Sequence, residues 1–187
     1  MKRSTRQLAF GFGLVLAFGS LLRAAEADPT THSFVGAEKC KMCHNSQAKG
    51  AQFTKWAGSR HARAYATLAT EEAKKIGAVK GIPDPQKAPE CLRCHVTGHC
   101  APADRLVDKY KVGDGVSCES CHGPGGDYWK MDVMKNRSKA TAAGLILPTE
   151  STCTTCHNAE SPNFQGFAFA EMNATIAHPN PQKAAAR

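Results

Sequence analysis

Apolar and polar positions alternate at helical spacing in several short stretches, and long polar segments separate these stretches. In residues 52–76, apolar side chains recur every three or four positions along one face, and His61 lies on that face. A Gly-Ser pair at 58–59 interrupts this predicted helix, and Gly77 ends it. We therefore expect His61 to face packed material.

A second helix is predicted over residues 128–143. Asp127 is suited to be its N-cap and Gly144 its C-terminal stop. Met131 and Met134 lie on adjacent turns of this helix. Their thioethers fit either core packing or a metal-binding role.

A third short amphipathic helix is predicted over residues 167–176, and Pro179 ends it. His178 stands directly at its end. The imidazole is therefore placed where the helix end can fold over a neighbouring site.

The N-terminus has the layout of a secretory signal. Three basic residues within the first six are followed by an uncharged apolar run over 8–22, which is too short to span a bilayer comfortably. Ala25 and Ala27 suit cleavage after position 27. Residues 1–27 are thus predicted to be a signal peptide, and 28–187 one exported, periplasmic domain. A retained N-terminal anchor is the alternative.

Charge gives little support to a nucleic-acid partner. The formal charge is +8, but the predicted signal holds four basic residues and one acidic residue, so the mature chain carries +5. No block of Lys and Arg is interleaved with aromatic residues. We expect no nucleic-acid binding.

Eight of the nine cysteines fall in four copies of Cys-x-x-Cys-His, the attachment signature of c-type haem. The spacing places two thiols about one helical turn apart, where both reach one porphyrin, and the next His becomes the proximal iron ligand. The haem-attaching cysteines are Cys40, Cys43, Cys91, Cys94, Cys118, Cys121, Cys153 and Cys156, and the proximal ligands are His44, His95, His122 and His157. Four covalently bound haems are the predicted cofactors.

Other uses of paired cysteines explain the pattern less well. Two zinc sites, a thioredoxin-like redox centre or a disulfide framework all leave the four adjoining histidines without a role. Cys100 stands outside the motifs, either as a loop or buried thiol or as a bridge to a second chain.

Four haems on the mature chain leave about 40 residues for each, so the haems must pack closely. Porphyrins then supply much of the apolar core, which accounts for an aromatic content of only 7%. Closely packed haems exchange electrons readily.

Four histidines lie outside the motifs and are candidates for the opposite faces of the irons: His32, His61, His99 and His178. His61 and His178 are the predicted ligands because of their helical positions. His99 lies too near His95 to cross its own haem easily, so a place beside a haem edge is expected. His32, in an extended arm, is expected to be solvated, with ligation as the alternative. Met131 and Met134 are weaker candidate ligands.

The sequence around the motifs resembles the tetrahaem cytochrome c-554 family. The resemblance covers most of the mature chain and rests on these segments: 34–36 (FVG), 56–62 (WAGSRHA), 94–98 (CHVTG), 115–125 (GVSCESCHGPG) and the closing Phe-Ala-Phe helix with His178. It implies an all-α fold with short helices, long loops and haems stacked in pairs.

The resemblance also implies ligands. It pairs His61 with the haem of the third motif and His178 with that of the fourth, and it implies an open sixth position on the haem of the second. Family members place a His shortly after the Gly-Pro-Gly of the third motif, whereas this chain has Gly126 to Met131 there. For the first haem, Met131, Met134, His32, His99 and an open site all remain candidates.

The expected function is electron transfer between a donor protein and an acceptor protein. A membrane-associated quinol oxidase or reductase is one candidate for such a partner. The alternative is an enzyme that reduces or oxidises a small molecule such as nitric oxide, nitrite or hydroxylamine at a haem with an open sixth position. A third option is assembly into an oligomer or filament.

Overall fold

The computed structural model describes residues 31–107 and 109–184. The predicted signal peptide, residues 1–27, lies outside the described residues. Within them the chain is helical with no strand, and a single β-bridge joins Phe34 to Leu106. The prediction of an all-α fold is confirmed.

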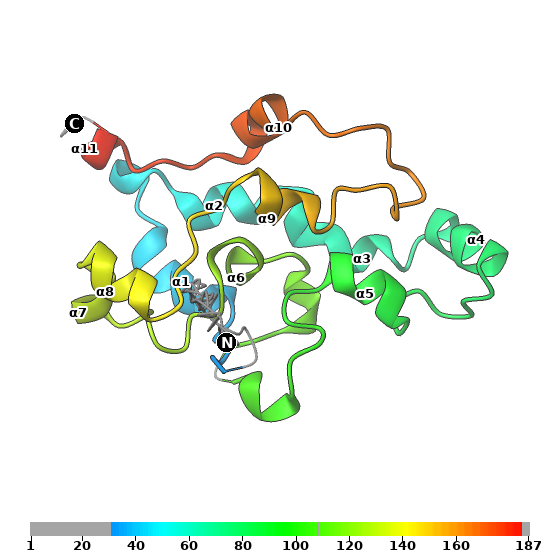
Figure 1. Cartoon of the computed structure of the whole chain (residues 1–187), viewed down its shortest axis with the longest axis horizontal. Coiled ribbons are helices and arrows are strands. Elements are labelled where there is room, and N and C mark those ends of the chain that lie inside the picture. Colours follow the sequence, from blue (N-terminus) through cyan, green and yellow to red (C-terminus); the bar gives the residue numbers. More distant parts are fainter. Residues whose placement is uncertain (1–30, 108, 185–187) are drawn as a thin grey trace, which may run out of the picture.

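Short helices and connecting loops follow one another along the described chain (Figure 1). The α-helices are α1 (Ala37–His44), α2 (Gln52–Ala57), α3 (Ala64–Thr67), α4 (Glu71–Val79), α5 (Pro89–His95), α6 (Cys118–His122), α7 (Met131–Met134), α8 (Arg137–Ala142), α9 (Glu150–Thr154), α10 (Phe169–Ile176) and α11 (Pro181–Ala184). Four 3₁₀ turns lie between them: η1 (Gln47–Lys49), η2 (His61–Arg63), η3 (Ala103–Arg105) and η4 (Val112–Asp114).

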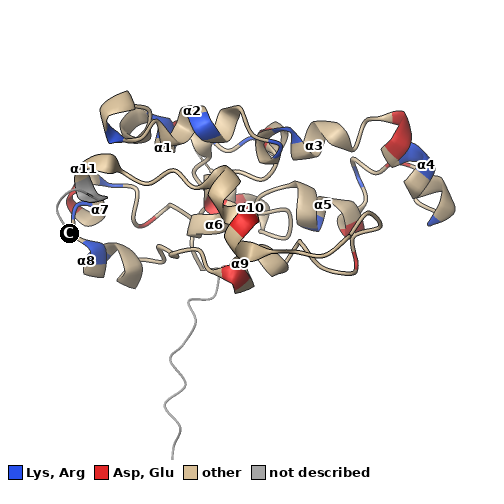
Figure 2. Cartoon of the chain, turned by 90° about the horizontal axis from the view of Figure 1, so that it is seen from above, with Lys and Arg blue, Asp and Glu red and all other residues tan. Residues whose placement is uncertain are grey.

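The helices form two layers along the long axis of the molecule. Seen from above, α1, α2 and α3 line one side and α4 projects at one end, while α6, α9 and α10 lie on the other side (Figure 2). Segments far apart in the sequence are therefore brought face to face.

The predicted helix over 52–76 is broken more than the sequence suggested. It consists of α2, η2, α3 and the first part of α4, and α4 continues past Gly77 to Val79. The hydroxyl of Thr70 caps α4 by accepting a hydrogen bond from the backbone N–H of Ala73 at 3.2 Å. Because a capping residue has an extended backbone, it interrupts the helix before it.

The predicted helix over 128–143 is also wrong in extent. It divides into α7 and α8, because the side chain of Asn136 caps α8 by accepting a hydrogen bond from the N–H of Lys139 at 3.0 Å. Asp127 caps neither helix. Gly144, with φ of 97°, ends the region as expected. The helix before His178 is confirmed as α10.

The side-chain core is small for a chain of this length. Among the described residues, eight apolar residues are buried, and none of the large side chains is less than 2% exposed. Apolar burial is the main stabilising term in folding, so side chains alone give this fold a limited core.

A buried carboxylate joins three backbone segments through hydrogen bonds. Glu119, within the third motif and 2% exposed, accepts hydrogen bonds from the N–H groups of Val35 at 2.9 Å, Gly36 at 2.8 Å and Gly125 at 2.6 Å. It thereby fixes α6 to the approach of α1 and to the loop after the third motif.

Candidate functional site

Each Cys-x-x-Cys-His motif lies in or beside a short helix. In α1, α5 and α6 the motif forms the last residues, so each helix ends on its histidine. The fourth motif begins in α9 and continues as a helical turn, in which the N–H of His157 donates to the carbonyl of Cys153 at 3.0 Å. Residues three apart on a helix share a face, so both thiols of each motif can reach one ligand.

The motifs meet in pairs. The thiols of Cys40 and Cys118 are close enough that their interaction raises the pKa of Cys40 and lowers that of Cys118, and α1 contacts α6. Motif one therefore adjoins motif three.

Motifs two and four adjoin in the same way. Burial and the neighbouring thiol of Cys156 raise the pKa of Cys94 to about 11, and a surface ion pair joins Arg93 to Glu160. Burial and then Cys153 raise the pKa of Cys121 to about 11, so motifs three and four are also neighbours. The attachment points thus follow the spatial order one, three, four, two.

Two pairs of imidazole rings from segments far apart in the sequence lie close together. The ring centres of His61 and His157 are 5.9 Å apart, and those of His122 and His178 are 6.1 Å apart. Two imidazoles bound on opposite sides of one metal, with bonds of about 2 Å, have centres about 6 Å apart. Both pairs therefore fit a haem iron with two axial histidines.

These ring pairs differ from the pairing that the family resemblance implied. His61 faces the histidine of the fourth motif, and His178 faces that of the third. The path of the chain explains this pairing. Val116 donates its N–H to the carbonyl of His61 at 3.0 Å, so the His61 segment lies beside the residues that precede α6. The chain after α10 places the His178 ring beside that of His122.

Backbone carbonyls orient three of the proximal or distal rings. Nδ1 of His95 lies 2.7 Å from the carbonyl of Ala64, and Nδ1 of His178 lies 2.9 Å from that of Ile176. Nδ1 of His122 lies 3.2 Å from the carbonyl of Ile146. An Nδ1–H that donates to a carbonyl leaves Nε2 as the nitrogen that binds a metal.

Burial keeps the facing histidines in the neutral form that metal binding requires. It lowers the pKa of His61, and the neighbouring His157 lowers it further. Burial likewise lowers the pKa of His122, to which His178 and His44 add. The neutral imidazoles of His61 and His122 can therefore each bind a cation through a nitrogen lone pair.

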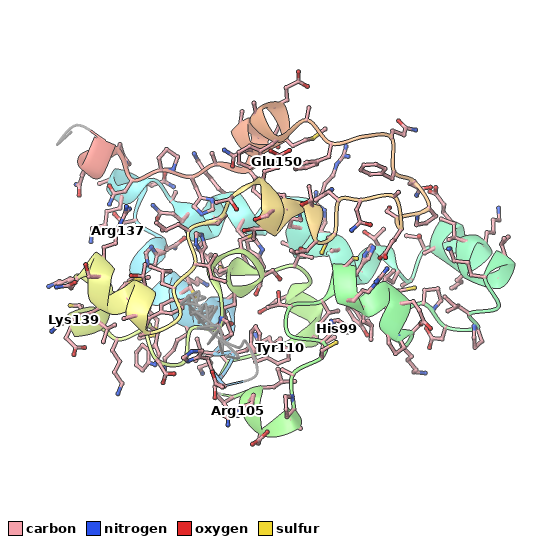
Figure 3. All side chains as sticks on the ribbon, in the orientation of Figure 1. His99, Arg105, Tyr110, Arg137, Lys139 and Glu150 are labelled. Carbon is pink, nitrogen blue, oxygen red and sulfur yellow. The ribbon has the colours of Figure 1, made fainter. Side chains whose placement is uncertain are left out.

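The other candidate ligands have different surroundings. His99 lies in the loop after α5, and its Nε2 is 2.9 Å from the sulfur of Cys100, which is exposed (Figure 3). Met131 is 60% exposed, and Met134 is half-buried. His32 is not solvated as expected, because its side chain is only 18% exposed.

The described residues show neither of two alternative arrangements of the cysteines. All nine cysteines are unpaired in the described chain. A zinc site of the tetrathiolate type needs four donors around one centre, whereas the described residues contain no group of three or more His, Cys, Asp or Glu placed to hold a metal ion.

The long-range contacts of two residues beside the motifs were not identified from the sequence. Glu119 reads as a variable position between two cysteines, and Asp127 reads as a helix cap. Their roles depend on contacts with segments that are 84 and 95 residues away, and no local pattern signals such contacts.

Comparison with known proteins agrees with these features. Residues 39–123 match the family described as cytochrome c554 and c-prime. The chain is 30% identical over 170 residues to cytochrome c-554 of Nitrosomonas europaea, an alignment that covers 82% of this chain and 70% of that protein. No solved structure matches it significantly. Within the described residues, no helix has the length and apolarity needed to cross a membrane.

Proposed function

Because the chain belongs to the cytochrome c-554 family, a family of c-type cytochromes that transfer electrons, we propose that it carries electrons through four haems in the periplasm. Covalently bound haem c and redox partner proteins follow from the family. We propose in addition that the chain holds four haems, that it acts in the periplasm, and that electrons pass between the haems in a fixed order.

The observation that carries the proposal is the succession of attachment points. Cys40 adjoins Cys118, Cys121 adjoins Cys153, and Cys94 adjoins Cys156. Because the thiols of neighbouring motifs influence one another, haems attached to them would lie close together. We propose the order first, third, fourth, second haem for electron transfer.

The residues of this chain would hold and insulate the cofactors. The eight motif cysteines would bind the porphyrins covalently, and the motif histidines with His61 and His178 would supply axial ligands. The haems supply the redox chemistry when bound. The protein sets their spacing, ligation and exposure.

Charge supports distinct docking surfaces for donor and acceptor. Residues 37–67, which include α1, α2 and α3, carry six Lys and Arg against one Glu, whereas 140–182, which include α9 and α10, carry three Glu and neither Lys nor Arg (Figure 2). We propose that an acidic partner docks on the α1–α3 layer and a basic partner on the opposite layer. Complementary charge steers such transient encounters.

The proposal is tested on the purified holoprotein. Mass and a haem assay should give four covalent haems, and a periplasmic fraction should contain the protein without residues 1–27. Carbon monoxide is then added to the dithionite-reduced protein. Fewer than four haems would contradict the tetrahaem proposal. A haem that binds carbon monoxide and also turns over nitrite, hydroxylamine or nitric oxide would favour the enzyme.

A further inference from the structure

His32 lies in a segment that is fixed to the rest of the fold. Arg105 donates from Nη1 to the carbonyl of Thr31 at 2.9 Å, and Gly126 donates its N–H to the carbonyl of Ser33 at 2.8 Å. Arg105 lies on the same side of the molecule as Tyr110 (Figure 3). The backbone is therefore held on both sides of His32.

One nitrogen of the His32 ring is hydrogen-bonded to a carboxylate. Nδ1 of His32 is 2.5 Å from the carboxylate oxygen Oδ2 of Asp127. When Nδ1 carries the proton and donates it to Asp127, Nε2 presents its lone pair. Metal-binding histidines are commonly oriented by a carboxylate in this way, which also increases the basicity of the ligand.

Gly144 covers one face of the same ring. A Cβ placed on Gly144 would be 3.3 Å from both Cδ2 and Nε2 of His32, and 3.6 Å from Cε1. An atom in the ring plane in front of Nε2 would be much closer to Nε2 than to the two carbons. Gly144 therefore lies over the ring face rather than in front of Nε2.

The residues around His32 belong to segments next to α6, the helix of the third motif, which contacts the helix of the first motif. Asp127 and Gly126 belong to the loop that follows α6, and Gly144 lies beside Gly123, the residue after His122. α6 is also the helix that α1 contacts. His99, the other candidate ligand among the histidines outside the motifs that does not lie beside a motif imidazole, follows the second motif instead.

We propose, resting on the function proposed above, that His32 binds the iron of the first haem through Nε2 and that Asp127 is its positioning residue. The third haem already has His178 facing His122. The ligand of the first haem then comes from the N-terminal arm, and the loop after the third motif supplies the carboxylate that orients it.

The test compares holoprotein variants after their haem content has been measured. His32→Ala should increase the number of haems that bind carbon monoxide by one per chain relative to the wild type, and one low-spin ferric signal should be lost. His99→Ala is the matched control and should leave both counts unchanged. In a Cys40→Ala/Cys43→Ala background, which lacks the first haem, His32→Ala should add no carbon monoxide site.

Asp127→Asn tests the positioning role. It keeps the size of the side chain but removes the negative charge, so the imidazole becomes a weaker donor to ferric iron and the potential of one haem should rise. His32→Met, which retains an axial ligand, should also raise one potential. These variants remain informative if His32→Ala assembles poorly.

Three results would overturn the inference. Unchanged carbon monoxide binding and low-spin signals in His32→Ala would exclude ligation, and a new carbon monoxide site in Met131→Ala or Met134→Ala would assign the position to a methionine. An added site in the background without the first haem would assign His32 to another iron. A wild-type haem content below four would instead count against the proposed function.

Discussion

The imidazole rings of His61 and His157 have centres 5.9 Å apart and planes inclined by 77°. They come from η2 and from the turn after α9, almost a hundred residues apart in sequence. The separation fits two ligands on opposite sides of one iron, and it connects the two layers of the molecule at the fourth motif.

The first prediction tests this pairing. His61→Ala and His178→Ala should each add one carbon monoxide site to the reduced holoprotein. In a Cys153→Ala/Cys156→Ala background, which lacks the fourth haem, His61→Ala should add none, because its iron is absent, whereas His178→Ala should still add one. Carbon monoxide titration followed by visible spectroscopy measures both. The opposite result would restore the pairing that the family resemblance implied.

The second prediction concerns Glu119. Glu119→Gln should lower the free energy of unfolding by about 1–3 kcal/mol, because the amide N–H₂ cannot accept the backbone N–H bonds that one carboxylate oxygen accepts. Denaturant unfolding of the holoprotein measures the change. Glu72→Gln, at an exposed position in α4, is the control and should change stability by less than about 0.5 kcal/mol. Equal effects would show that the buried contacts contribute nothing specific.

The stability that depends on Glu119 should also vary with pH. Burial raises its pKa above the ordinary 4.5, although three N–H donors oppose the rise. The folded state then keeps a proton at pH values where the unfolded state has lost it. Stability of the wild type relative to Glu119→Gln should therefore be greatest below pH 4.5 and decrease as pH rises through the folded pKa. A relative stability that increases with pH would contradict this sign.

The third prediction concerns the turn that leads into α1. Gly36 has φ of 84°, and a Cβ there would lie 2.2 Å from the carbonyl oxygen of Lys109. Gly36→Ala should therefore cost about 1–3 kcal/mol or more and reduce the yield of holoprotein. Gly113→Ala, where a Cβ meets nothing within 4 Å, should have little effect. Thermal unfolding and haem content per chain measure both variants.

The fourth prediction concerns the basic layer. Lys55→Glu and Arg60→Glu, at exposed positions, should slow oxidation of the reduced protein by anionic ferricyanide and weaken the salt dependence of the rate, because fewer positive charges attract the anion. Glu171→Lys on the opposite layer should not slow it. Stopped-flow absorbance at several ionic strengths measures these rates. If Glu171→Lys accelerated the reaction as much as the other two variants slow it, only net charge would matter, and slowing by Glu171→Lys would contradict the prediction.

The sequence alone determined the chemistry and the fold class. Four Cys-x-x-Cys-His motifs are local patterns, and local spacing is sufficient to place two thiols and an imidazole on one haem. The flanking segments indicated the family, and helical periodicity located α10 and the face that carries His61. The family resemblance also implied that the helices would be short, whereas local periodicity overestimated the length of two of them.

Only the tertiary structure decided which residues face one another. The caps at Thr70 and Asn136 divided helices that periodicity had joined, because a side-chain hydrogen bond to the backbone outweighed weak helix propensity. The rings of His61 and His178 lie beside other motif histidines than the resemblance implied, because the path of the chain, rather than sequence distance, determines which motif each ring meets. The contact of Glu119 with Val35 and that of Asp127 with His32 each join segments more than 80 residues apart. Such contacts form when the layers pack together, so no local sequence pattern records them.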